Sequence, residues 1–276
     1  MLVKRLLASA VVVAVLRIAS FARAPATQID GKRVFKNDDV VFHRIDEHTR
    51  VGSGHIMASE SLYLVEGNDK AVLIDAGTRI TDLDTIVASL TKKRVMRVVT
   101  HAHPDHTGSA INDSPGLYIG AGDAASPLLS TCRGKIRELK DADVIDLGGR
   151  TLNVVATPGH TPGSTTFIDK TAGYGFSGDS FGSGNLLLGG TFSTLLATCQ
   201  KTSALMEKHG IKRLYPGHFF GKNAETKQRL DDMAAISRDV LAGKVKGEPN
   251  PRGMMGLNLV ITAYGVRINY SESSVK

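Results

Sequence analysis

Four side chains that can bind a metal ion lie within six positions of the sequence: His101, His103, Asp105 and His106. Imidazole and carboxylate groups suit a borderline ion such as Zn(II). The segment follows the apolar run 95–99, and a loop that leaves the end of a strand can turn several side chains toward one point. Pro104 restricts the backbone there and Gly108 permits a turn. This spacing predicts a metal-binding loop.

Three more candidate ligands stand in similar settings. His160 follows the strand-like run 151–155, and His218 follows the run 211–215, each through a turn that contains proline and glycine. Loops on rigid elements often carry functional groups. Asp179 ends another apolar run, although a Gly-Asp pair is also common turn chemistry. Taken together, these residues predict one site with six or seven ligands.

The order and spacing of these segments resemble the metallo-β-lactamase superfamily of metal-dependent hydrolases, over about residues 40–220. The resemblance implies two metal ions, one bound by His101, His103 and His160 and the other by Asp105, His106 and His218. Asp179 falls where many dinuclear members place a bridging carboxylate. In one β-lactamase subclass the same turn contributes a serine near the metal, which here is Ser180. We favour Asp179, because a carboxylate spans two cations more readily than a hydroxyl group does.

An internal repeat predicts how these segments are arranged. In the first half a hairpin (61–74), a helix (about 80–93) and a strand (95–99) precede the first histidine; in the second half a hairpin (165–177), a helix (about 192–208) and a strand (211–215) precede the last. Two such halves would stack with equivalent strand ends along one seam. With the resemblance, this predicts an α/β fold: a four-layer αβ/βα sandwich of two similar half-domains, with the metals at their junction.

Composition is consistent with one catalytic domain over residues 27–276. The chain has 276 residues and 42% hydrophobic content, enough for a large core. A helix at about 224–242 is expected to cover one sheet, and the apolar segment 256–264 to add an edge strand. Cys132 and Cys199 could form one disulfide in an exported protein, but the position of Cys199 on an apolar helix stripe favours a buried thiol.

Residues 1–26 resemble a secretory signal peptide, with a basic start, an apolar run at 6–16 and small residues before Thr27. We expect a periplasmic or secreted protein with no stable membrane span after cleavage; an uncleaved segment would anchor the chain instead. The segment holds four basic residues and no acid, so the formal charge of +7 falls to +3 without it. No basic cluster with interleaved aromatics is present, so no nucleic-acid partner is expected.

The resemblance also implies a reaction. Two Zn(II) ions, or Mn or Fe in their place, would hold a hydroxide that attacks the carbonyl of a small-molecule amide, lactam, ester or thioester, and Asp105 would orient that hydroxide. A β-lactamase is one option. The alternatives are a non-hydrolytic, iron-dependent member of the superfamily or a metal-binding protein without turnover. The presence of both Asp105 and His106 favours two ions and hydrolysis.

Two expectations concern residues around the metals. The segment 178–190 is expected to form part of the substrate rim, with Ser180, Ser183, Asn185 and Leu187 near the substrate, because polar donors and apolar side chains alternate there. Asp75 ends the first hairpin where Asp179 ends the second. It is expected to accept a hydrogen bond from a ligand histidine or from the ligand loop and not to bind a metal.

Overall fold

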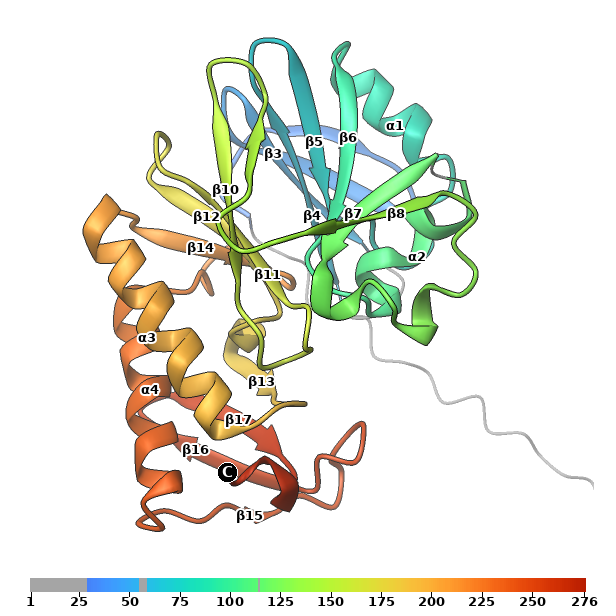
Figure 1. Cartoon of the computed structure of the whole chain (residues 1–276). Coiled ribbons are helices and arrows are strands. Elements are labelled where there is room, and N and C mark those ends of the chain that lie inside the picture. Colours follow the sequence, from blue (N-terminus) through green and yellow to red (C-terminus); the bar gives the residue numbers. More distant parts are fainter. Residues whose placement is uncertain (1–28, 55–58, 114) are drawn as a thin grey trace, which may run out of the picture.

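A computed structural model describes residues 29–54, 59–113 and 115–276; the predicted signal peptide lies outside the described residues. Two sheets face each other and helices cover their outer faces (Figure 1). The helices are α1 (Leu83–Leu90) and α2 (Pro104–Asp113) beside the first sheet, and α3 (Phe192–His209) and α4 (Lys227–Leu241) beside the second. This arrangement is the predicted four-layer sandwich. Among the described helices, none is long and apolar enough to cross a membrane.

The first sheet has eight strands that follow one another in chain order. They are β1 (Arg33–Lys36), β2 (Val40–Asp46), β3 (Thr49–Gly54), β4 (Ser61–Glu66), β5 (Lys70–Ile74), β6 (Arg94–Val99), β7 (Gly116–Gly120) and β8 (Lys135–Leu139). Strands β1 to β5 pair antiparallel, whereas β5 to β8 pair parallel. Helix α1 makes the crossover between β5 and β6, so the chain leaves both strands at the same edge of the sheet.

The second sheet repeats this plan with five strands in the order β14-β12-β11-β10-β9. They are β9 (Val144–Asp146), β10 (Thr151–Ala156), β11 (Thr165–Asp169), β12 (Tyr174–Gly178) and β14 (Arg213–Pro216). The β11–β12 hairpin is followed by α3 and by β14, which pairs parallel with β12. The first half has the same sequence of parts in β4–β5, α1 and β6. The predicted repeat is therefore confirmed.

The core lies in three layers because strand residues alternate between the two faces of a sheet. Val72 and Ile74 point to the inner face and pack with Phe167 and Phe176 of the facing sheet. The outer faces bury separate clusters under α1 and under α3 and α4. At the seam, Tyr63 donates a hydrogen bond to the carbonyl oxygen of Pro216 over 2.5 Å. That bond joins the two halves beside the ends of their strands.

A third, four-stranded sheet was not expected. It consists of β13 (Asn185–Leu187), β17 (Val266–Tyr270), β16 (Leu259–Ala263) and β15 (Glu248–Pro249), in that order. The prediction that residues 256–264 form an edge strand is wrong in its placement, because β16 lies between β15 and β17. Tyr264 and Gly265 both have positive φ (51° and 70°). Two such residues form the tight turn that favours a hairpin, so the chain folds back as β17.

The remaining short elements are the 3-10 helices η1 (Ala121–Asp123), η2 (Pro127–Leu129), η3 (Gly182–Gly184) and η4 (Glu272–Ser274). Both cysteines are free thiols, so the disulfide considered from the sequence is not present. Cys199 is fully buried on α3, as its apolar stripe predicted.

Candidate metal centre

All seven predicted ligands lie at one end of the sandwich, just beyond the ends of strands or in the first turn of a helix. They follow β6 (His101 and His103), begin α2 (Asp105 and His106), or follow β10 (His160), β12 (Asp179) and β14 (His218). Parallel strands leave a sheet at the same edge, which is why segments so far apart in sequence meet there. The ligand segment was predicted as a loop, but its second half is the start of α2, with Pro104 at the first helical position.

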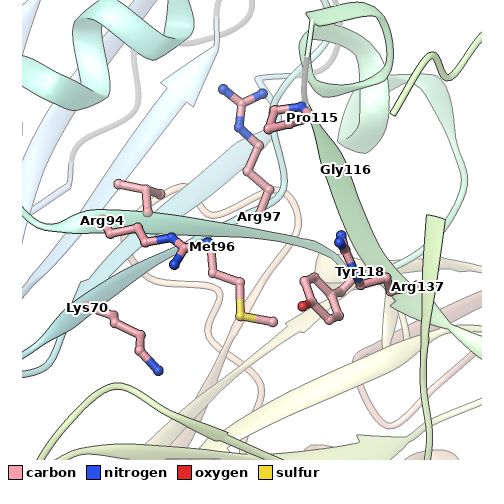
Figure 2. Close-up of a pocket in the computed structure, with 9 residues that line it drawn as sticks. Lys70, Arg94, Met96, Arg97, Pro115, Gly116, Tyr118 and Arg137 are labelled. Atoms are coloured by element: carbon pink, nitrogen blue, oxygen red, sulfur yellow. The ribbon is translucent and has the colours of Figure 1, made fainter. Parts of the chain in front are cut away.

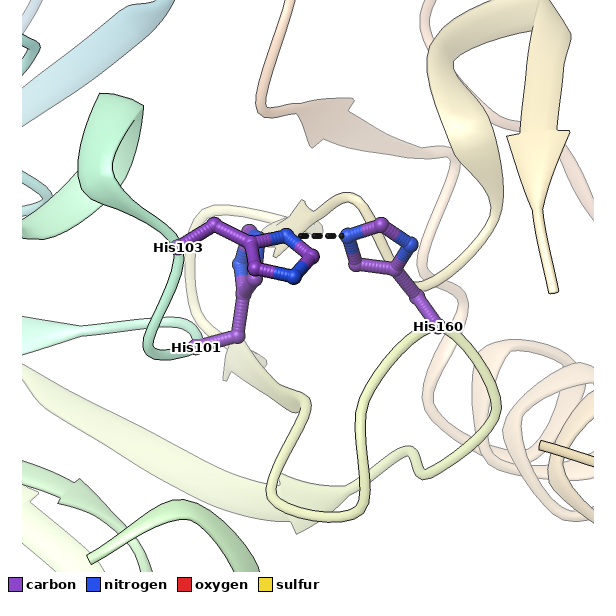
Figure 3. Close-up of side chains that lie close together, drawn as sticks. All are labelled: His101, His103 and His160. Carbon is purple, nitrogen blue, oxygen red and sulfur yellow. Dashed lines mark hydrogen bonds between the residues drawn. The ribbon is translucent and has the colours of Figure 1, made fainter. Parts of the chain in front are cut away.

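Three histidines converge on one point (Figure 3). Nδ1 of His103 lies 3.1 Å from Nε2 of His101 and 2.9 Å from Nε2 of His160. Burial lowers the pKa of His101 well below its usual value, and the charges of His106 and His160 lower it further. Burial also lowers the pKa of His103. Neutral imidazoles with facing ring nitrogens are donors suited to a metal ion.

The second cluster contains Asp105, His106 and His218, whose ligand atoms also lie within 4.8 Å of one another. Oδ2 of Asp105 is 3.6 Å from Nε2 of His106 and 3.5 Å from Nε2 of His218. Oδ2 of Asp179 lies between the two clusters, 3.3 Å from Nε2 of His218, 3.6 Å from that of His106 and 3.8 Å from that of His160. A carboxylate in this place can contact cations on both sides.

The charges of the second cluster are coupled. Burial alone would raise the pKa of Asp179, but the imidazoles of His218 and His106 hold it well below its usual range. Burial would lower the pKa of His106, yet the carboxylates of Asp75 and Asp179 raise it well above its usual value. The pKa of His218 is raised by Asp179 in the same way. The carboxylates in and around this cluster therefore favour positive charge beside Asp179.

Two of the candidate ligand histidines are oriented by hydrogen bonds from the ring nitrogen that faces away from the centre. Nδ1 of His106 lies 2.8 Å from Oδ2 of Asp75, whose carboxylate also accepts from the backbone N–H of Thr100 at 2.7 Å. Nδ1 of His160 lies 2.7 Å from the carbonyl oxygen of Leu187 and donates to it. A histidine that donates from Nδ1 presents the lone pair of Nε2 to a metal. The predicted hydrogen bond that Asp75 accepts from a ligand-type histidine is confirmed.

Asp123 is a positioning residue that the sequence reasoning missed. Its carboxylate accepts from the N–H of Ala102 (3.0 Å), the hydroxyl of Thr161 (2.7 Å) and the N–H of Gly163 (2.7 Å). It therefore joins the loop of His101 and His103 to the loop of His160. A local sequence pattern could have indicated Asp123, because it follows a strand and a glycine, as Asp179 does.

The donor set fits metal ions on observations of this structure. Nε2 of His106 and Oδ1 of Asp179 are buried and have no hydrogen-bond partner among the described residues. Buried polar atoms are rarely left in that state, and a cation would satisfy both. The packing leaves room for nothing larger than hydrogen at Gly217, where a Cβ atom would collide with Oδ1 of Asp179 and lie 2.6 Å from Cε1 of His106. Glycine thus lets the last ligand loop approach the centre.

A cleft of about 610 Å³ opens at this centre, and five of the seven predicted ligands line it: His103, Asp105, His160, Asp179 and His218. His101 and His106 are buried behind them. Of the predicted rim residues, Ser183, Asn185 and Leu187 line this cleft. Ser180 does not: its side chain is buried and its Oγ lies 2.8 Å from Oγ1 of Thr157. The expectation that Ser180 faces a substrate is corrected accordingly. The cleft has further apolar walls that the sequence reasoning missed, formed by Leu128, Phe220, Met254 and Met255.

The loops at this cleft are fastened to one another by Asn223. Its Nδ2 donates to the carbonyl oxygens of His218 (2.7 Å) and Ser183 (3.1 Å), and its Oδ1 accepts from the N–H of Phe220 (2.7 Å). Oγ of Ser183 accepts from the N–H of His218 at 3.2 Å. One wall of the cleft is therefore held directly against a candidate ligand loop.

A second recess lies away from the ligands, at the start of β5 and β6 (Figure 2). Lys70, Arg94, Arg97 and Arg137 line it, and the guanidinium of Arg137 stands 5.3 Å from the ring centre of Tyr118. Arg97 forms an ion pair with Asp84. The described residues that line this recess include no carboxylate and no imidazole. The expected lack of a nucleic-acid partner stays a prediction.

The chain belongs to the metallo-beta-lactamase superfamily, whose family model matches residues 59–112 and 114–241. The superfamily is metal-dependent, and this chain is a metal-dependent hydrolase of that family. It is similar to the acyl-coenzyme A thioesterase MBLAC2 of Bos taurus, with 28% identity over 66% of this chain and 84% of that protein. The human protein of the same name is 26% identical over the same shares.

A lactamase-like protein, ptaB of Pestalotiopsis fici, is 30% identical over 74% of this chain and 66% of that protein. Among solved structures, a metallo beta lactamase from Erythrobacter litoralis matches 75% of this chain and all of that one, with a TM-score of 0.59 and 16% identity. A metallo-beta-lactamase from Pontibacter korlensis gives a TM-score of 0.58 over 73% of this chain, also at 16% identity. These two structures support the fold.

Proposed function

We propose that this chain is an exported hydrolase that uses two divalent metal ions to cleave a small-molecule carbonyl compound, and that its substrate is an acyl thioester. One observation carries the proposal: two candidate ligand clusters lie next to each other at a single cleft, with the carboxylate of Asp179 between them. Adjacent cations of this kind are typical of metal-assisted hydrolysis.

The clusters suggest which residue binds which ion. The three histidines that meet at Nδ1 of His103 would hold one ion, and Asp105, His106 and His218 the other, with Asp179 between them. Nitrogen and oxygen donors in these numbers suit Zn(II), and Mn or Fe would fit the same ligands. When bound, the ions supply Lewis acidity and a nucleophilic water at neutral pH.

Side chains and backbone groups of the protein would position the attacking water and orient the candidate ligands. Asp105 has a side chain that is 23% exposed, so its carboxylate faces the cleft and can accept a hydrogen bond from an attacking water. Asp75 keeps the proton of His106 on Nδ1, and Leu187 does the same for His160. Both of these histidines are themselves buried, which strengthens the electrostatic contacts that orient them.

Two observations support a thioester over the other carbonyl classes. The relatives named acyl-coenzyme A thioesterase match 66% of this chain. The cleft also has a wall of apolar side chains, formed by Leu128, Phe220, Met254 and Met255, which suits an acyl group. β-Lactam hydrolysis, the narrower option considered from the sequence, serves as the comparison in the assay.

Metal analysis and a substrate panel test this proposal. Purified protein should contain about two ions per chain and hydrolyse acyl thioesters faster than chromogenic β-lactams or lactones. His101→Ala should lose most of its metal and its activity. A chain that binds at most one ion would reject the assignment of two metal sites. Rapid hydrolysis of β-lactams without hydrolysis of thioesters would show that the substrate is a β-lactam and not a thioester. Dioxygen consumption with bound iron would support the non-hydrolytic alternative.

Export is a separate part of the proposal, supported by the character of residues 1–26. Expression with its own N-terminus should yield a mature protein outside the cytoplasm that begins near Thr27. N-terminal sequencing of the fractionated protein checks this. An intact N-terminus in a soluble cytoplasmic fraction would contradict export, whereas an intact N-terminus in the membrane fraction would indicate an anchor.

A further inference from the structure

Exposed hydrophobic side chains gather at the mouth of the candidate active-site cleft. Within the described part of the chain, four of the large hydrophobic residues that are exposed line this one cleft: Leu128, Phe220, Met254 and Met255. Met254 and Met255 are each 64% exposed. Large apolar side chains grouped in this way mark a binding surface more often than scattered ones do.

The two methionines come from the C-terminal region and not from the two half-domains. They sit in the segment between β15 and β16, which belong to the third sheet. Met255 has φ of 56°, and Gly256 follows with φ of 77°. A positive φ is uncommon for a residue with a side chain and indicates a sharp, specified turn. This turn brings Met254 and Met255 to the cleft.

A chain of amide hydrogen bonds fixes this segment relative to the metal centre. Nδ2 of Asn250 donates to Oδ1 of Asn269 at 3.0 Å, and Nδ2 of Asn269 donates to Oδ1 of Asn185 at 2.8 Å. Asn185 itself lines the cleft, on the strand that also carries Leu187. The carbonyl oxygen of Leu187 in turn accepts from His160. The methionine turn is thus connected through the third sheet to a candidate ligand.

The chemistry of the turn indicates its ligand. Methionine is unbranched and polarizable, so it adapts to apolar groups of different length and shape. The wall formed by Leu128, Phe220 and the two methionines has no charged member, whereas the other side chains that line the cleft include five candidate metal ligands. A molecule that fits both parts has one polar, reactive end and one long apolar chain.

We propose that the turn containing Met254 and Met255 binds the alkyl chain of the substrate and sets a preference for long acyl groups. This inference rests on the proposed hydrolysis of acyl thioesters and adds the length of the acyl chain. Burying an alkyl chain against two methionine side chains should raise affinity about tenfold or more over a short acyl group.

The double variant Met254→Ser/Met255→Ser tests the inference. Tyr264→Ser is the matched control, because Tyr264 is also 64% exposed and lies in the same sheet region but not in the cleft. The full-length, metal-loaded proteins are compared in two assays. One measures kcat/KM with acetyl, octanoyl and dodecanoyl thioesters of one thiol. The other measures calorimetric binding of the corresponding ethyl and dodecyl thioethers, which cannot be hydrolysed.

In the wild type, kcat/KM and thioether affinity should both rise with chain length. The double variant should lose about tenfold on the long compounds and less than about twofold on the shortest, with unchanged metal content, and the control should match the wild type. Equal affinity for ethyl and dodecyl thioethers, or an equal loss at every length, would overturn the inference. Length-dependent thioether binding without any thioester turnover would instead reject the proposed function and leave the alkyl site standing.

Discussion

Asp75→Asn should weaken metal binding without disturbing the fold. Oδ1 of Asp75 accepts from the N–H of Thr100 at 2.7 Å, while Oδ2 lies 2.9 Å from the hydroxyl of Thr100 and 2.8 Å from Nδ1 of His106. In the variant, the amide oxygen can keep the bond to the N–H of Thr100. The NH₂ group then faces His106 and can only donate.

The neutral His106 would then carry its proton on Nε2, the atom that faces the metal centre, and not on Nδ1. Loss of such a supporting contact lowers metal affinity by about 10- to 100-fold, or about 1.4–2.8 kcal/mol. The backbone should be undisturbed, because Asp75 has φ of 61° and asparagine tolerates this left-handed conformation well. The metal-free variant should therefore still fold, but thermal denaturation should show a lower stability, because the buried carboxylate of Asp75 pairs with His106 and raises its pKa.

Competition with a chromogenic chelator measures the affinity of both ions. Asp82→Asn is the control, because Asp82 also has a left-handed backbone (φ of 53°) but is exposed and is not one of the candidate ligands. Only the ion assigned to His106 should weaken in Asp75→Asn. Two ions bound with wild-type affinity would refute the reasoning, as would an equal loss at the three-histidine site.

Three further changes have definite expected results. Arg150→Met leaves the fully buried carboxylate of Asp169 without its guanidinium partner at 2.5 Å, so urea unfolding should show a loss of about 3–5 kcal/mol while kcat stays unchanged. Burial raises the pKa of Glu225 from 4.5 to about 7, even though the charge of Arg229 lowers it. The contribution of this carboxyl group to the free energy of unfolding is therefore fully present below pH 4.5 and is lost as the pH rises through about 7. The stability of wild type relative to Glu225→Gln should accordingly fall by about 3 kcal/mol over that interval, and a constant difference in urea titrations would contradict it. His103→Ala should lose metal and activity but remain folded, because its loop lies outside the core; loss of soluble protein would mean that the metal is required for folding.

Much of the fold was predictable because the spacing of apolar residues within one segment shows which face of that segment is buried. Helix α3 was expected at 192–208 and is observed at Phe192–His209. Helix α4 starts three residues later than its prediction, at Lys227, because Glu225 pairs with Leu214 as an isolated bridge and Thr226 caps the helix. Helix α1 is shorter than expected because Asp82 adopts a left-handed conformation immediately before it.

The seven ligand-type residues of the site were predictable for a different reason. Their side-chain types are rare in combination, and each follows a strand that can be recognised from its neighbours. The apolar wall was not predictable in this way. Met254 and Met255 reach the cleft through the parallel pairing of β13 with β17, which joins Leu186 to Ile268, and a contact so distant in sequence leaves no local pattern. Asp123 does follow a strand through glycine, but its three partners lie on two different loops, and the sequence does not show that these loops meet.

The distribution of the ligands between the two halves has a consequence for how the chain unfolds. Each ligand cluster draws on both halves: His160 joins two histidines of the first half, and His218 joins Asp105 and His106. A state with only one half folded therefore retains no complete set for either proposed ion. A ligand that binds only the fully folded chain at 1,000 times its Kd adds about 4.1 kcal/mol to stability. Metal should thus suppress half-folded intermediates and make the two halves unfold as a single cooperative unit.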